Sequence, residues 1–405
     1  MIYFFDPGGR GRRPIELYRD VAEKYGFVIA GSNNSRNFSS DQSKSVNAIW
    51  QDTHVRLALD EHRVYTSGFS GGARVAGAMA LGCVQCRIAG VIAHGAGYPS
   101  HQPEPTSKMR YFFAIGDQDF NWPEVMMIRR EREEKGLPYR VRTFSGPHQW
   151  APAAIIEDAI QWMTLRGMQA GDMVVDANFV DKLFRQAQEQ AEEAEKKSDA
   201  TAQMNAYRSL ISDFAGLKDP GEAEKKLTLL KKSAALKAAL KGEQEHIAEQ
   251  SALVNDISSK LQAYISGSAA DSSALHNDIM QAMGGLKDQA AHSRNEGTRL
   301  VSKRALDDVF VAWMESGQQE LQSRHFERAE ACFQIMSEVN DDPWPTLMLA
   351  ETHAAAGNRK LAIKDLRETL KRGLNDASVI ESDDKLQVLS SDPEFQRLVE
   401  QLKHK

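Results

Sequence analysis

Residues 1 to about 165 alternate between short apolar segments and longer amphipathic ones, and this alternation limits the folds open to the chain more than any other feature. Strands are predicted near 2–5, 27–31, 63–68, 87–93, 110–115 and 140–144, and helices near 14–25, 41–60, 72–82, 122–135 and 151–166. Strands that alternate with helices form a mainly parallel sheet covered on both faces. We therefore expect an α/β domain over residues 1–166.

Strand patterns stop near residue 165, and the remaining sequence predicts an all-α region. The stretch from Asn178 to about Lys303 is rich in Ala, Glu, Lys and Gln. Helices are predicted over 181–197, 222–241 and 243–264, with a break at 219–221 and a connector at 267–273. The charge runs are those of solvated helix faces. Residues 167–303 are therefore predicted to form a helical linker or coiled region.

The pentapeptide Gly68-Phe69-Ser70-Gly71-Gly72 has the G-x-S-x-G form of a nucleophile elbow. It lies between a predicted strand and a predicted helix, which is the context that the motif requires. The glycines let strand and helix approach closely around a strained serine, and the first N–H groups of the helix can stabilise an oxyanion. Ser70 is the candidate nucleophile, and an inert serine in a glycine turn is the alternative.

Two polar loops follow later strands in the order that a Ser-Asp-His triad needs. Asp117 and Asp119 come directly after the apolar segment 111–115, and His148 follows the segment 141–144. Catalytic groups of open α/β sheets lie at such carboxyl ends of strands. The alternatives are that the aspartates cap the helix that begins near Pro123, and that His148 is a surface histidine.

On these segments the first 165 residues or so resemble an α/β-hydrolase of the esterase type, in the group of polyhydroxybutyrate depolymerases and feruloyl esterases. The matching segments are Gly68–Gly72, Gly116–Asp119 and Gly146–Trp150. The resemblance implies that Ser70 is the nucleophile, His148 the base and Asp119 the acid. The group's Gly-x-x-Asp pattern selects Asp119, although Asp117 in the same loop stays open. The implied activity is hydrolysis of a small carboxylic ester through an acyl-enzyme, with no cofactor or metal.

An oxyanion hole needs two donors. The Gly71 N–H, directly after the nucleophile, is the first candidate. The glycine-rich loop at 6–11 should supply the second, from Gly9 or Arg10.

Aromatic side chains near these loops are candidates for an aromatic-binding pocket, with ordinary packing as the alternative. They are Tyr98, Phe120, Trp122 and Trp150. His94 is expected in a loop near the pocket and not as a catalyst.

The resemblance also predicts an open sheet edge. The group normally has strands before the one that leads into the 6–11 loop, whereas that strand lies at 2–5 here. The strand at 27–31 would then lie at the edge, which proteins usually cover or pair. Three explanations stay open: the sequence lacks an N-terminal segment, another segment covers the edge, or two chains pair there. The group is often exported, which favours export here, although residues 1–5 are too short for a signal-peptide core.

The C-terminal stretch 304–405 resembles tetratricopeptide repeats, in which small and bulky residues at fixed offsets let antiparallel helices nest. One unit fits Trp313, Gly317, Ala329 and Phe333, and a second fits Ala350, Ala362 and Leu366, with the small residues twelve positions apart in both. The region is predicted either to bind a protein partner or to pack on the hydrolase domain and stabilise it or mediate dimerisation. A lid or wall over the active site is a third option. A hydrolase-fold scaffold without activity is the alternative to an esterase.

Composition narrows the function classes. With 405 residues the chain fits two or three domains. Its net charge of -6 does not favour nucleic-acid binding, and no stretch is long and apolar enough for a membrane span. Cys83 and Cys86 lack further ligands for zinc. Free thiols are favoured there, and a disulfide stays open for an exported protein.

Overall fold

A computed structural model describes residues 1–37, 39, 41–99, 109–267 and 269–404 of the chain. The chain divides into two compact units, Met1–Ile247 and Ala248–Lys405. The predicted limits at 166 and 303 fall inside the helices α5 (Ala153–Ala170) and α11 (Glu296–Gln322). The three-part division stays a prediction.

Six parallel strands form the sheet of the first unit, in the order β2-β1-β3-β4-β5-β6. They are β1 (Ile2–Phe5), β2 (Ile29–Ser32), β3 (Tyr65–Phe69), β4 (Gly90–His94), β5 (Arg110–Gly116) and β6 (Tyr139–Phe144). The four strands β1, β3, β4 and β5 lie inside the sheet, and every residue of β1, β4 and β5 is buried. Their apolar runs are typical of parallel strands covered on both faces. The α/β fold expected from the sequence is confirmed.

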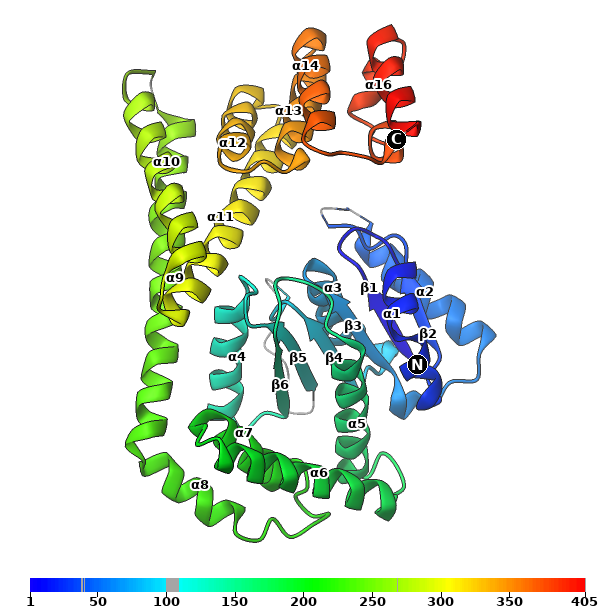
Figure 1. The fold of residues 1–405 in the computed structure, drawn as a ribbon. Helices are drawn as coiled ribbons and strands as arrows, with labels where there is room; N and C mark the ends of the chain where they lie inside the picture. Colours follow the sequence, from blue (N-terminus) through cyan, green and yellow to red (C-terminus); the bar gives the residue numbers. More distant parts are fainter. Residues whose placement is uncertain (38, 40, 100–108, 268, 405) are drawn as a thin grey trace. The chain divides into compact units, whose positions relative to one another are not determined.

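Helices cover both faces of this sheet, and Figure 1 shows α4 and α5 on opposite sides of it. The helices are α1 (Arg12–Lys24), α2 (Gln42–Arg56), α3 (Gly71–Gly82), α4 (Trp122–Glu134) and α5 (Ala153–Ala170). Tyr3 and Phe113 point to the core that includes α2, α3 and α4, whereas Phe4 and Phe112 point to the core that includes α1 and α5. This alternation follows from the two-residue period of a strand.

The strand β2 lies at one edge of the sheet, paired with β1 alone among the described strands. This is the position that the sequence predicts for the segment 27–31, which the structure shifts to 29–32. The other edge is β6. The helix α2 ends at Arg56, before the predicted limit of 60, because Leu57 adopts an extended backbone.

Helices after α5 complete the first unit around a separate apolar cluster that includes Leu183, Met204 and Phe214. They are α6 (Ala177–Lys196), α7 (Ala200–Ser212), α8 (Ala223–Lys232) and the first part of α9 (Ala234–Ser266). The predicted helix 222–241 is divided at Ser233, whose extended backbone ends α8. The predicted connector 267–273 is shorter, because α10 already begins at Ala269.

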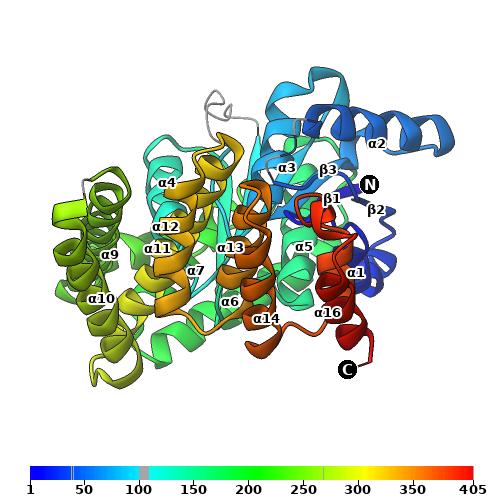
Figure 2. The ribbon, with the colours of Figure 1, turned by 90° about the horizontal axis from the view of Figure 1, so that it is seen from above.

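The second unit is all helical in its described residues, as the sequence predicts. It continues from α9 through α10 (Ala269–His292), α11, α12 (Phe326–Val339), α13 (Pro343–Ala355), α14 (Arg359–Lys371), α15 (Ala377–Glu381), η3 (Leu386–Leu389) and α16 (Pro393–Lys403). Figure 2 shows α11 to α14 side by side. No described helix is both long and apolar enough to span a bilayer.

Small residues let neighbouring helices of the second unit approach. A Cβ on Gly317 in α11 would lie 2.5 Å from the Phe333 ring in α12. Ala350 and Ala362, on α13 and α14, are both fully buried in one cluster. These contacts agree with the offsets in the sequence, and a tetratricopeptide identity stays a prediction.

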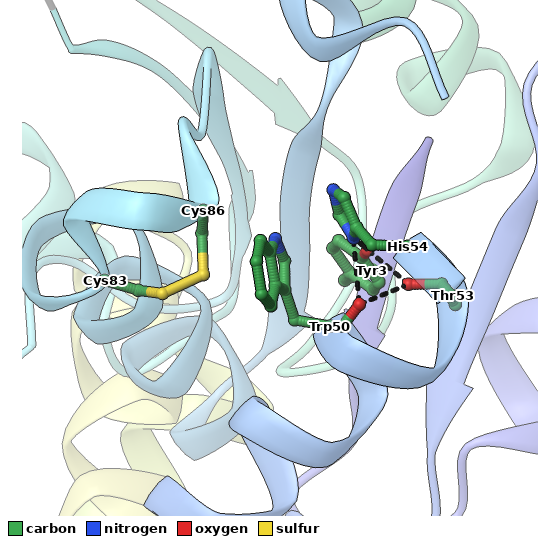
Figure 3. Close-up of a disulfide and its surroundings, with 6 residues drawn as sticks. All are labelled: Tyr3, Trp50, Thr53, His54, Cys83 and Cys86. Carbon is green, nitrogen blue, oxygen red and sulfur yellow. Dashed lines mark hydrogen bonds between the residues drawn. A yellow bond between two sulfur atoms is a disulfide. The ribbon is translucent and has the colours of Figure 1, made fainter. Parts of the chain in front are cut away.

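A disulfide joins Cys83 to Cys86 where α3 ends and the short helix η2 (Val84–Cys86) begins. The favoured expectation of two free thiols is therefore wrong for this structure. Figure 3 shows the disulfide together with Trp50 and the hydrogen-bonded group of Tyr3, Thr53 and His54. Burial raises the pKa of the remaining thiol, Cys332, to about 11.

Candidate active site

Ser70 lies between β3 and α3, and its backbone adopts an unusual turn conformation. Its φ is 54° and its ψ is -123°, a strained conformation for a residue with a side chain. Close packing explains the flanking glycines: a Cβ on Gly68 would lie 2.1 Å from the Gly72 oxygen, and one on Gly72 would lie 2.0 Å from the Phe5 oxygen. The sequence thus holds the serine in a sharp strand-to-helix turn.

A hydrogen bond joins the predicted base to the predicted acid. His148 Nδ1 lies 2.9 Å from Asp119 Oδ2, and the Asp119 side chain is fully buried. The other oxygen, Oδ1, accepts the Asn121 N–H at 2.9 Å. Asp119 is therefore fixed in orientation, and it holds the Nδ1 side of the imidazole. The N-cap of α4 is Asn121, so Asp119 does not have the capping role that the sequence left open.

The neighbouring Asp117 has a different partner. Its Oδ1 accepts the N–H of Gly146 at 3.0 Å, and its own N–H donates to the Phe144 oxygen at 2.9 Å. These bonds join the loop after β5 to the loop after β6, which carries His148. The structure therefore places the Asp119 carboxylate against the His148 imidazole and the Asp117 carboxylate against the backbone of the loop that carries His148.

Aromatic rings enclose the imidazole of His148. The ring of Phe69, adjacent to Ser70, lies 4.5 Å from it between centroids, and the ring of Phe120 lies 4.3 Å from it. Phe69 thus connects the turn of Ser70 to the His148 imidazole. The His148 side chain is 19% exposed, so solvent can reach it.

Gly95, after β4, leaves room for the hydrogen-bonded side chains of Asp119 and His148. Its φ is +62°, and a Cβ there would lie 2.9 Å from Asp119 Oδ2, 3.0 Å from the Phe69 ring and 3.1 Å from the His148 ring. Sequence reasoning missed Gly95, because its role depends on side chains from three other elements.

The loop 6–11 turns its N–H groups toward its own residues. Asp6 Oδ1 accepts the N–H of Gly8 at 2.9 Å and that of Arg10 at 3.4 Å, while the Gly9 N–H donates to the Asp6 carbonyl at 2.9 Å. The Gly11 N–H donates to Asn33 Oδ1 at 3.1 Å. The predicted oxyanion donors Gly9 and Arg10 are therefore both engaged with Asp6 in this structure.

Asp6 also connects this loop to the segment of His148. Its carboxylate is buried, and Oδ2 accepts the Trp150 indole N–H at 3.1 Å. Trp150 is itself 5% exposed and packs on Phe4, Tyr18, His94 and Phe69. It supports the site from within the core.

The other predicted pocket residues lie around the loops after β4 and β5. Tyr98 is packed on Tyr111 and Phe113, and its hydroxyl accepts a bond from Arg132 at 2.9 Å. Trp122 begins α4 and packs on the same core. The Phe120 ring contacts His148, a predicted catalytic side chain. A pocket role for the four stays a prediction.

His94 ends β4 and does not lie in a loop as expected. Burial lowers its pKa to about 3, so it is neutral. The Ala151 N–H donates to its Nδ1 at 3.4 Å, and its Nε2 lies 3.2 Å from Ser67 Oγ. His94 is thus a packed core histidine beneath the site.

No three His, Cys, Asp or Glu side chains gather into a metal site among the described residues.

No protein-family model and no curated protein match the chain. Among solved structures, the chain is similar to an S-formylglutathione hydrolase, FrmB, from Staphylococcus aureus (13% identity, 40% of this chain and 80% of that one, TM-score 0.34). It is also similar to a Bacillus cereus carboxylesterase (15%, 40% and 87%, 0.33) and a ferulic acid esterase (14%, 39% and 80%, 0.30). At these TM-scores the likeness carries no argument about activity.

Proposed function

We propose that the first unit is a serine hydrolase that cleaves a small carboxylic ester through an acyl-enzyme. The observation that carries this proposal is the hydrogen bond between His148 and the buried carboxylate of Asp119. Ser70 has the elbow conformation, and its neighbour Phe69 packs on the His148 ring. A packing role gives no reason to combine a strained Ser70 with an oriented imidazole.

In the proposed reaction, Ser70 Oγ attacks the ester carbonyl while His148 Nε2 takes the hydroxyl proton. His148 then gives that proton to the leaving alkoxide as the ester C–O bond breaks. Water attacks the acyl-enzyme in the second half, with His148 again as base, and releases the acid. Asp119 holds Nδ1–H throughout and stabilises the imidazolium that forms.

Labelling with a fluorophosphonate probe tests this directly, alongside turnover of p-nitrophenyl acetate. We expect labelling and turnover in the native chain and neither in Ser70→Ala. A folded native chain that takes no label and turns over no ester would overturn the proposal.

The alternative function is a scaffold that acts through its helices. The observation that favours it is the engagement of the Gly9 and Arg10 N–H groups with Asp6, which leaves the expected second oxyanion donor occupied. In that case the chain would stay unlabelled.

We also propose that the second unit is a tetratricopeptide-like surface for a protein partner or for self-association. The close helix pairs α11–α12 and α13–α14 support this. Sedimentation of the full chain over a concentration series tests the second option, since a mass that stays monomeric throughout would exclude self-association.

A further inference from the structure

Every N–H group from Gly8 to Gly11 already has an acceptor. Gly8 and Arg10 use Asp6 Oδ1, Gly9 uses the Asp6 carbonyl, and Gly11 uses Asn33 Oδ1. Asp6 is fully buried, so turning the Gly8 and Arg10 N–H groups outward would take two backbone donors from a buried carboxylate oxygen, which is costly. An oxyanion at Ser70 therefore needs a second donor from elsewhere.

The side-chain amide of Asn37 lies directly against Gly71, the first residue of α3. A Cβ on Gly71 would fall 1.9 Å from Asn37 Oδ1 and 2.7 Å from Nδ2. Asn37 thus occupies the space beside the residue whose N–H is the expected first donor. Oδ1 is the nearer atom in this structure, and rotation of the amide about the Cβ–Cγ bond exchanges the positions of Oδ1 and Nδ2.

The Asn37 backbone is fixed on the same loop. Its N–H donates to the Pro7 carbonyl at 2.8 Å, and Ser35 Oγ donates to the Asp6 carbonyl at 3.1 Å. The segment 33–37 and the loop 6–11 therefore form one hydrogen-bonded layer next to the nucleophile turn. The backbone that carries the Asn37 amide is thereby held next to the turn, and a transition-state donor works best when it is held in place before the reaction.

We propose that Asn37 is a catalytic residue whose side-chain Nδ2–H₂, together with the Gly71 N–H, binds the oxyanion of the tetrahedral intermediate. This inference rests on the proposed function. It replaces the loop donors Gly9 and Arg10 with a side chain, as asparagine amides do in other oxyanion holes. No bond forms or breaks at Asn37; it donates a hydrogen bond that strengthens as charge develops on the carbonyl oxygen.

The test measures kcat and KM for p-nitrophenyl acetate, and the rate of fluorophosphonate labelling, in Asn37→Ala and Asn37→Asp. We expect kcat to fall by about 100-fold in both, with KM within about threefold of the native value. Asn34→Ala is the matched control, because Asn34 is exposed in the same segment, and its kcat should stay within about twofold of the native value.

Gly71→Ala gives a second test that does not depend on how well Asn37→Ala folds. The new Cβ must displace the amide, so Gly71→Ala should lose as much activity as Asn37→Ala. The double variant should be no slower than the slower single variant. If the native chain labels and turns over but Asn37→Ala and Asn37→Asp keep its kcat, the inference is overturned while the esterase proposal stands. A native chain without labelling overturns both.

Discussion

Asp119 and Asp117 stand two positions apart in one loop and have different partners: Asp119 hydrogen-bonds to His148, at 2.9 Å from its Nδ1, while Asp117 accepts the Gly146 N–H. The first contact orients an imidazole, and the second joins two loops. Replacing each aspartate with asparagine therefore separates an acid from a loop support.

Asp119→Asn should lower kcat for p-nitrophenyl acetate by about 10⁴-fold, because the amide favours the wrong imidazole tautomer. Asp117→Asn weakens one backbone contact, so we expect a loss of less than about tenfold. Steady-state kinetics with circular dichroism of both variants provide the check. Equal losses would remove the distinction between the two carboxylates.

Gly95→Ala should lower both stability and activity, because its Cβ would press on Asp119, Phe69 and His148. Gly136→Ala is the control, since Gly136 has a φ of +63° but no atom within 4 Å of its Cβ position. The positive φ alone should lower the free energy of unfolding by about 1–2 kcal/mol in each of the two variants. We expect at least a tenfold further loss of kcat in Gly95→Ala only, measured beside thermal melts of both variants.

The sequence predicted the sheet well because buried parallel strands are continuous apolar runs, as in Phe112 and Phe113. Motif order also predicted Ser70, His148 and an aspartate at 117 or 119, and the family resemblance selected Asp119. The structure brings Asp119 and His148 into contact. Their catalytic roles stay proposals.

The sequence could not predict contacts between residues that are far apart in the chain. The pairs Asn37 with Gly71, and Asp6 with Trp150, join different elements without a shared motif. Helix limits were also missed where a single residue turns extended, as at Ser233, because no strong breaker marks it.

Because Cys83 and Cys86 form a disulfide, a thiol titration of the unfolded chain should count one thiol without reductant and three with reductant. Closing so short a loop should stabilise the first unit by about 2 kcal/mol. The double variant Cys83→Ser/Cys86→Ser should therefore melt about 5 °C lower and no longer respond to reductant. Three thiols counted in unreduced, unfolded protein would contradict the disulfide.

His353 predicts a pH dependence for the second unit. Its Nδ1 lies 2.6 Å from Asp365 on α14 and its Nε2 lies 3.3 Å from Glu330 on α12. The hydrogen bond to Asp365 raises the pKa of His353 above the ordinary value of 6.5. Protonated His353 therefore contributes fully to the free energy of unfolding below about pH 6.5. This contribution is lost as the pH rises through the folded-state pKa of His353.

Urea unfolding of the full chain at pH 6 and pH 9 measures this effect. His353→Gln should cost about 2 kcal/mol at pH 6 and less at pH 9. His292→Gln is the control, because His292 is exposed and should change little at either pH. A cost for His353→Gln that does not vary with pH would show that the residue only packs.

The hydrogen bond from Trp150 to Asp6 predicts that Trp150→Phe lowers activity through the positions of two loops, and not through a lost substrate contact. Trp150→Phe keeps an aromatic ring but removes the indole N–H, so Asp6 Oδ2 loses a donor that lies at 3.1 Å. A buried acceptor without a partner costs about 1–3 kcal/mol. We expect kcat to fall about tenfold because the loop 6–11 and the His148 loop lose their shared bond.

Trp162→Phe is the matched control for this variant. Trp162 is buried, and its indole N–H donates to the buried Asp213 at 2.8 Å, between α5 and the end of α7. Both variants should lower the melting temperature by a few degrees, since each removes one indole–carboxylate bond. Only Trp150→Phe should lose kcat, because only its carboxylate holds a loop of the site. Equal kcat in the two variants would mean that Asp6 stabilises the fold without positioning the catalytic loops.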